Sequence, residues 1–210
     1  MSTTAIDIQE MVERVNAVAI PAGFGGAFCE RYDAWMFADI GCEIRNFLRI
    51  VDGRLVLSDA QRGHTEEDLL FSTPLLTDME KFLTFYFCNS LRGRSRLPRL
   101  SLVSIPVTKD KVAAEFSIEE LDESPWYQLR HRDKALVRCG DDVELVKFSH
   151  YVDLSPEEIR VSALDPGGEP HFMVMGRPGL PPAASEAARE RRCPRTNPRS
   201  SRRSFWRRWR

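Results

Sequence analysis

The sequence lacks the long apolar segments that membrane proteins and secreted precursors carry. No stretch approaches the roughly 20 apolar residues of a membrane span. The N-terminus, Met1 to Glu10, has neither a basic flank nor an apolar run of signal-peptide length. From these absences we expect a cytoplasmic protein without a membrane-spanning helix.

Cysteine is scarce and irregularly spaced. The chain has five: Cys29, Cys42, Cys88, Cys139 and Cys193. Their number is odd, and no two form a C-x-x-C element. This pattern predicts reduced thiols, and Cys42 and Cys88 lie in apolar segments where free cysteine packs as a small hydrophobic residue.

The motifs of known enzymes and metal proteins are also missing. The four histidines have no H-x-x-x-H or H-E-x-x-H spacing, and none has a cysteine at zinc-site spacing. The chain has no G-x-S-x-G elbow and no family-type cysteine signature. Gly23 to Gly26 lacks the spacing of either phosphate-binding loop, so we interpret it as a turn. We expect no catalytic residue, no cofactor and no metal.

Charge is unevenly distributed along the chain. Residues 1–175 carry 29 acidic and 19 basic side chains, a net charge of -10, whereas residues 176–210 carry 2 and 11, a net charge of +9. Phosphates would be repelled by so acidic a body, which therefore suits a basic protein partner better than nucleic acid.

Two acidic runs are the candidate contacts for such a partner. Runs of this kind are usually solvated faces, but they also attract a basic protein and raise its association rate. On charge alone, the candidate partner-binding residues are Glu66, Glu67, Glu119, Glu120, Asp122 and Glu123.

Hydrophobic periodicity predicts secondary structure in the first half of the chain. A capping box at Thr4 and helical spacing of apolar residues predict a helix over 5–19. Strands are expected at 35–40, 44–51, 55–57 and 68–72. Asp52-Gly53 predicts a tight hairpin, because both residues tolerate a positive φ.

The second half mixes helix and strand signals. A capping box at Thr77 predicts a helix over 78–91, and Ser155-Pro156-Glu157-Glu158 predicts a short helix that ends near Leu164. Strands are expected at 100–106, 113–118, 126–129, 135–139 and 143–152. The mixture, without regular βαβ alternation, predicts a single α+β domain over 1–175, with an antiparallel sheet and about three helices.

Two basic segments leave alternatives open. Arg92, Arg94, Arg96 and Arg99 suit phosphate contact, although charge complementarity at a helix C-terminus explains them more simply. Residues 176–210 are rich in Arg, Pro, Ala and Ser, and we expect them to be a disordered tail. Their aromatic–arginine ending suits nucleic acid or an anionic membrane, but they also resemble an unselected or out-of-frame extension.

Several segments between residues 8 and 173 together resemble the immunity protein 61 family of bacterial polymorphic-toxin systems. The segments are Gly41 to Phe47, Thr77 to Leu83, Leu97 to Leu100, Phe148 to Tyr151, Leu154 to Ile159 and Leu164 to Phe172. That family includes antitoxins similar to that of the tuberculosis necrotizing toxin. The resemblance rests on the order and spacing of these segments. None of the matching residues can be identified as a toxin contact.

The resemblance implies a cytoplasmic antitoxin that binds and inhibits a secreted or contact-delivered toxin by occluding its active site. For that toxin type the blocked activity would be NAD+ glycohydrolysis. We expect the free form to be a monomer. The alternative function is a nucleic-acid or anionic membrane-surface binder that acts through the tail, and an enzyme assembled from scattered residues ranks last.

Overall fold

The computed structural model describes residues 5–61, 67–122 and 126–174. The first half contains α1 (Ala5–Ala19), β1 (Phe24–Cys29), β2 (Ala34–Asp39), β3 (Ile44–Val51), β4 (Arg54–Gln61) and β5 (Asp68–Thr73). The second half contains α2 (Leu76–Arg94), β6 (Leu100–Ser101), β7 (Phe116–Glu120), β8 (Tyr127–His131), β9 (Lys134–Cys139), α3 (Asp142–Ser149), α4 (Pro156–Leu164) and β10 (Met173–Val174). Short 3-10 turns, η1 (Glu30–Tyr32) and η2 (Lys109–Lys111), precede β2 and β7.

Eight strands form one antiparallel sheet, in the order β1-β2-β3-β4-β5-β9-β8-β7. The two hairpin-rich halves meet where β5 pairs with β9, and β6 pairs separately with β10. Helices and an antiparallel sheet confirm the predicted α+β class. The predicted limit of the domain at residue 175 and the disorder of 176–210 stay predictions, because the tail lies outside the described residues.

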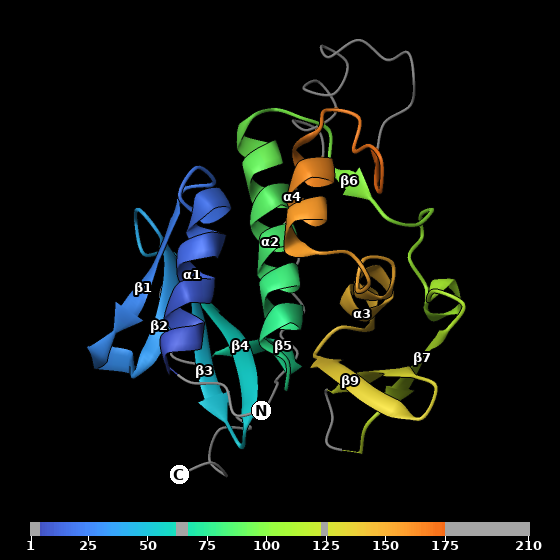
Figure 1. The fold of residues 1–210 in the computed structure, drawn as a ribbon, viewed down its shortest axis with the longest axis horizontal. Helices are drawn as coiled ribbons and strands as arrows, with labels where there is room; N and C mark the ends of the chain where they lie inside the picture. Colours follow the sequence, from blue (N-terminus) through green and yellow to red (C-terminus); the bar gives the residue numbers. More distant parts are fainter. Residues whose placement is uncertain (1–4, 62–66, 123–125, 175–210) are drawn as a thin grey trace, which may run out of the picture. The chain divides into compact units, whose positions relative to one another are not determined.

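The helices pack on the sheet through its apolar face. In Figure 1, α1 crosses in front of the strands β1 to β3, and α2 runs beside it. The helix α4 packs against α2, whereas α3 contacts β7, β8 and β9. Strand residues that alternate with the core-facing ones point to the opposite face. There Ala34, Phe47 and Ala60 form a small second cluster with Tyr32 and Met36.

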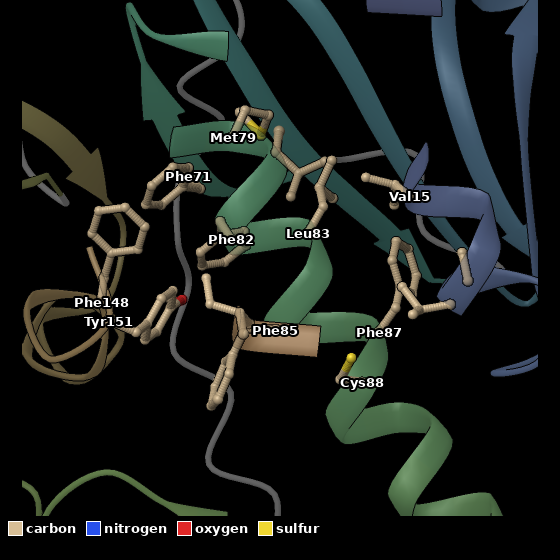
Figure 2. Packing of buried hydrophobic residues seen from close by; sticks show 14 of the residues in the cluster. Val15, Phe71, Met79, Phe82, Leu83, Phe85, Phe87, Cys88, Phe148 and Tyr151 are labelled. Atoms are coloured by element: carbon tan, nitrogen blue, oxygen red, sulfur yellow. The ribbon is translucent and has the colours of Figure 1, made fainter. Parts of the chain in front are cut away.

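The helix α2 is the centre of the core because its side chains contact packing partners on several sides. Figure 2 shows Phe82 and Phe85 pointing toward Phe148 and Tyr151, and Phe87 pointing toward α1. The ring of Phe82 stacks on that of Phe71 at 4.2 Å. Aromatic pairs of this kind add to the free energy gained from burying their area.

Local signals placed several elements correctly. The helix over 5–19 and the strand over 44–51 have the predicted bounds, and the hairpin turn has positive φ at Asp52 (51°) and Gly53 (72°). Ser155 and Glu158 form the predicted capping box of α4. The predicted cap at Thr77 is wrong: α2 begins at Leu76, and its N-cap residue Leu75 makes no side-chain capping bond.

Three sequence interpretations are corrected by the structure. The strand expected over 143–152 is instead the helix α3, which Asp141 caps by accepting a hydrogen bond from the Val143 amide. Of the strand expected over 100–106, only Leu100–Ser101 is extended and paired. The glycine-rich turn after α1 is largely the edge strand β1, which is paired along its whole length with β2.

Candidate functional site

Of the described cysteines, Cys88 and Cys139 are buried, whereas Cys42, which we expected to pack as a small hydrophobic residue, is exposed. Burial raises the pKa of the Cys88 and Cys139 thiols to about 12, so both stay protonated at neutral pH. His150 follows α3 rather than a strand, and its Nε2 lies 2.8 Å from the Lys111 carbonyl oxygen. Within residues 5–61, 67–122 and 126–174, no group of three or more His, Cys, Asp or Glu side chains is arranged to hold a metal ion.

Most of the described acidic candidates contact cations of the same chain. Glu67 accepts two hydrogen bonds from Arg49, at 2.6 and 3.0 Å, and a third from the Ser58 hydroxyl. Glu119 lies 3.3 Å from Arg130. These contacts offset part of the negative charge that would attract a basic partner.

The remaining candidates are Glu120, Asp122, Glu66 and Glu123. Glu120 lies 3.9 Å from the Lys109 ammonium nitrogen, and Asp122 is exposed. Glu66 and Glu123 lie outside the described residues. Glu67 directly precedes β5 and Glu119 lies on β7, with β9 and β8 between them. The fold therefore does not bring the two acidic runs together, and whether either contacts a partner stays a prediction.

The arginine cluster at the end of α2 begins with a buried residue, Arg92. Arg92 is fully buried and donates hydrogen bonds only to backbone carbonyls: Pro98 at 2.8 Å, Ala163 at 2.9 Å, Asp165 at 2.5 Å and Pro166 at 3.0 Å. Desolvation lowers the pKa of its guanidinium. Arg92 thus ties the end of α2 to the end of α4 and is not available to a phosphate.

A surface groove with a volume of about 690 Å³ lies where the start of α1 meets the ends of the first three strands. Its apolar lining comes from Ile6, Phe28, Trp35 and Ile50. The rings of Phe28 and Trp35 pack edge to face, with centroids 5.1 Å apart. Ile6 is 72% exposed, and Phe28 and Ile50 are each 46% exposed.

The chain forms this groove because α1 presents its apolar stripe to the core and leaves Ile6 off that stripe. The buried residues of the stripe are Ile8, Met11, Val12, Val15 and Val18. Ile6 precedes Ile8 by two positions, about 200° around a helix, so it cannot join them. Phe28 lies near the end of β1, and Trp35, with which it is paired, lies near the start of β2.

The polar lining of the groove includes two carboxylates. Its residues are Gln9, Glu10, Asp33 and Arg49. Gln9 accepts a hydrogen bond from the Trp35 indole nitrogen at 3.4 Å. Glu10 and Asp33 are exposed, and Asp33 has a φ of 46°. This group was not predicted from the sequence, since its members come from three separate segments with no common spacing.

The opposite face of the sheet carries a second polar feature. Arg54 donates to the Ser72 hydroxyl at 3.0 Å and to the Ser72 carbonyl at 3.1 Å. Burial, followed by repulsion from Arg138, lowers the pKa of the Arg54 guanidinium. Arg138 donates to Gln128 at 3.3 Å. Both arginines are held by neutral groups of the sheet, which is a structural role.

Comparison with known proteins places this fold in one family. The model of the family described as immunity protein 61 matches residues 18–171. Two mycobacterial proteins, "Immunity factor for TNT" of Mycobacterium tuberculosis (strain ATCC 25618 / H37Rv) and its homolog in Mycobacterium bovis (strain BCG / Pasteur 1173P2), are each 30% identical over 140 residues. Those residues span 64% of this chain and 75% of each relative.

A solved structure, described as Rv3902c from M. tuberculosis, is similar in fold. It superimposes with a TM-score of 0.67 at 23% identity, covering 77% of this chain and 93% of the solved one. The family match extends from the end of α1 through α4 and includes the groove residues on β1, β2 and β3. The chain therefore belongs to the immunity protein 61 family.

Proposed function

We propose that this protein is an antitoxin that binds and inhibits a cognate toxin of the cell that makes it. The observation that carries the proposal is the family match over residues 18–171. The two mycobacterial relatives, whose names describe them as immunity factors, support it over 140 aligned residues.

We propose further that the toxin is an NAD+ glycohydrolase. The support is the designation of both relatives as immunity factors for TNT or its homolog, together with the resemblance to antitoxins of the tuberculosis necrotizing toxin. On this proposal the protein is an inhibitor rather than an enzyme, and it acts in the cytoplasm, where the toxin would otherwise consume NAD+.

The proposed mechanism is steric occlusion of the toxin's active site in a stoichiometric complex. An interface of the common size, about 1,600 Å² in total, is large enough to cover a catalytic cleft. The net charge of -10 over residues 1–175 supports a toxin with a basic surface, since opposite charges speed association.

Co-expression tests this function directly. The full chain is produced together with the toxin domain encoded next to it, and cell survival, cellular NAD+ and co-purification are measured. A toxin variant without activity serves as the control for expression. Survival with NAD+ preserved and a co-purifying complex is the expected result. Death of cells that contain folded, abundant protein, with no complex, would reject the proposal.

A further inference from the structure

The groove at the start of α1 brings several exposed apolar side chains together. Ile6, Phe28 and Ile50 line it. Other exposed large apolar residues, such as Ile44 on β3 and Val161 on α4, do not line it. Single exposed apolar residues are ordinary, whereas a group around a hollow is typical of a contact surface.

The carboxylates of the groove lack a close ion-pair partner among the described residues. Neither Glu10 nor Asp33 forms an ion pair there, although Glu10 acts electrostatically on Arg14. Arg49, which also lines the groove, is already bound by both carboxylate oxygens of Glu67. Arg14, one turn after Glu10, gives two hydrogen bonds of 2.8 Å to Glu80. The groove thus combines apolar walls with an excess of negative charge.

We propose that this groove is the docking site for the toxin, and that it receives a toxin loop with an aliphatic or aromatic side chain next to a lysine or arginine. The inference rests on the proposed function and adds the place of contact. The apolar walls provide the area to be desolvated, and Glu10 and Asp33 pair with the cation. A second copy of this chain fits less well, because it would bring the same carboxylates together.

The apolar contribution is tested with the full chain and the purified toxin domain in a binding titration. Ile6→Gln with Ile50→Thr removes apolar surface while keeping a good helix former and a β-branched strand residue. Val161→Gln with Ile44→Thr makes the matched change on an exposed helix residue and an exposed strand residue that do not line the groove. The groove pair should raise Kd about 10-fold or more, and the control pair less than about 2-fold.

The charge contribution is tested by association kinetics at low and high salt. Glu10→Gln with Asp33→Asn removes both charges, and asparagine tolerates the positive φ of residue 33. Glu115→Gln with Asp133→Asn is the acidic control, on exposed carboxylates that do not line the groove. The groove pair should slow association severalfold at low salt and weaken its salt dependence, whereas the control pair should associate like the wild type. Thermal unfolding of each variant verifies that it is folded.

The outcomes separate this inference from the proposed function. If the wild type binds the toxin and both groove pairs bind equally well, the docking site is wrong and the antitoxin function stands. If the folded wild type does not bind the toxin, the function fails and the docking site with it. A free dimer that the groove pairs convert to monomers would assign the groove to a second copy. If residues 176–210 were protected from trypsin in the wild type but not in the groove variants, the occupant of the groove would be the tail. Either of these last two results overturns the proposal.

Discussion

At the residue scale, the clearest lesson is the difference between arginines that look alike in the sequence. Arg92 and Arg99 belong to the same basic cluster, yet Arg92 is fully buried and Arg99 is exposed. A charged group so fully removed from water needs hydrogen-bond acceptors for its donors, and the four carbonyls around Arg92 supply them. No local pattern in the sequence distinguishes the two, because these acceptors come mostly from residues some 70 positions away.

We predict that Arg92→Gln destabilises the fold strongly. Glutamine has two amide donors for four carbonyl acceptors, so buried carbonyls would be left without partners at a cost of about 3 kcal/mol. The matched change Arg99→Gln should alter the free energy of unfolding by less than about 0.5 kcal/mol. Denaturant unfolding followed by circular dichroism measures both. Equal stability of the two variants would show that the buried network contributes nothing.

A second residue-scale prediction concerns pH. Burial, followed by repulsion from Asp68, raises the pKa of the Asp59 carboxyl. Above both its folded and unfolded pKa values the ionised group therefore lowers the free energy of unfolding. As the pH falls through the raised folded-state pKa, the folded state takes up the proton before the unfolded state does. The destabilisation by the ionised carboxyl then disappears.

Asp59→Asn should accordingly stabilise the protein near about pH 7, and the gain should shrink as the pH is lowered toward about 4. The measurement is the denaturant midpoint of variant and wild type across that range. Asp122→Asn, on an exposed carboxyl, is the control and should show no such trend. A gain that grew toward acid pH would contradict the sign of the shift.

At the scale of elements, the structure shows where local signals sufficed and where they did not. The helix α1 and the strand β3 follow hydrophobic periodicity, and α4 follows its capping box, so all three could be placed from the sequence. The prediction of a strand where the helix α3 lies was wrong because Val143 and Leu145 alternate with charged residues, as in a strand, and eight residues show little of a helical period. The Asp141 cap of α3 was the available signal.

The strand β1 was missed because its glycines favour turns and tertiary contacts hold it extended. The Asn16 side chain of α1 bonds both the amide and the carbonyl of Gly26, at 2.9 and 2.8 Å. These two backbone groups are therefore not available to pair with a further strand. This protects the β1 edge of the sheet from pairing with another chain. The groove was not predictable for the same reason, since one of its walls depends on β1.

We predict that Gly26→Ala destabilises β1, whereas Gly25→Ala does not. A Cβ at Gly26 would lie 2.4 Å from Phe37 Cε1 and 2.8 Å from Asn16 Oδ1, but a Cβ at Gly25 meets nothing within 4 Å. The overpacking should cost about 1–3 kcal/mol. Thermal unfolding measures it, and similar midpoints for the two variants would contradict the account of how α1 fixes the edge.

At the scale of the whole molecule, the family and the acidic body could be predicted from the sequence, but the two carboxylates that line the groove could not. The charge runs predicted partner contacts at Glu67 and Glu119, but in the fold each of these carboxylates lies next to an arginine of the same chain. The exposed carboxylates of the groove are single residues in sequence, and only folding brings Glu10 and Asp33 to one surface.

The tail provides a further prediction at this scale. The account assigns toxin binding to the described domain, so removal of residues 176–210 should leave the affinity for the toxin unchanged within about 2-fold. Binding titrations of the full and shortened chains measure this. Loss of binding by a shortened chain that is still folded would instead support the basic tail as the functional segment, and strong salt dependence would accompany it.

The most direct test of the central claim is a titration of purified toxin domain with the full chain while NAD+ hydrolysis is measured. We expect activity to fall linearly to near zero and to stop changing at a fixed molar ratio, as a tight stoichiometric inhibitor requires. Hydrolysis that continues undiminished in the presence of excess folded protein would contradict the claim.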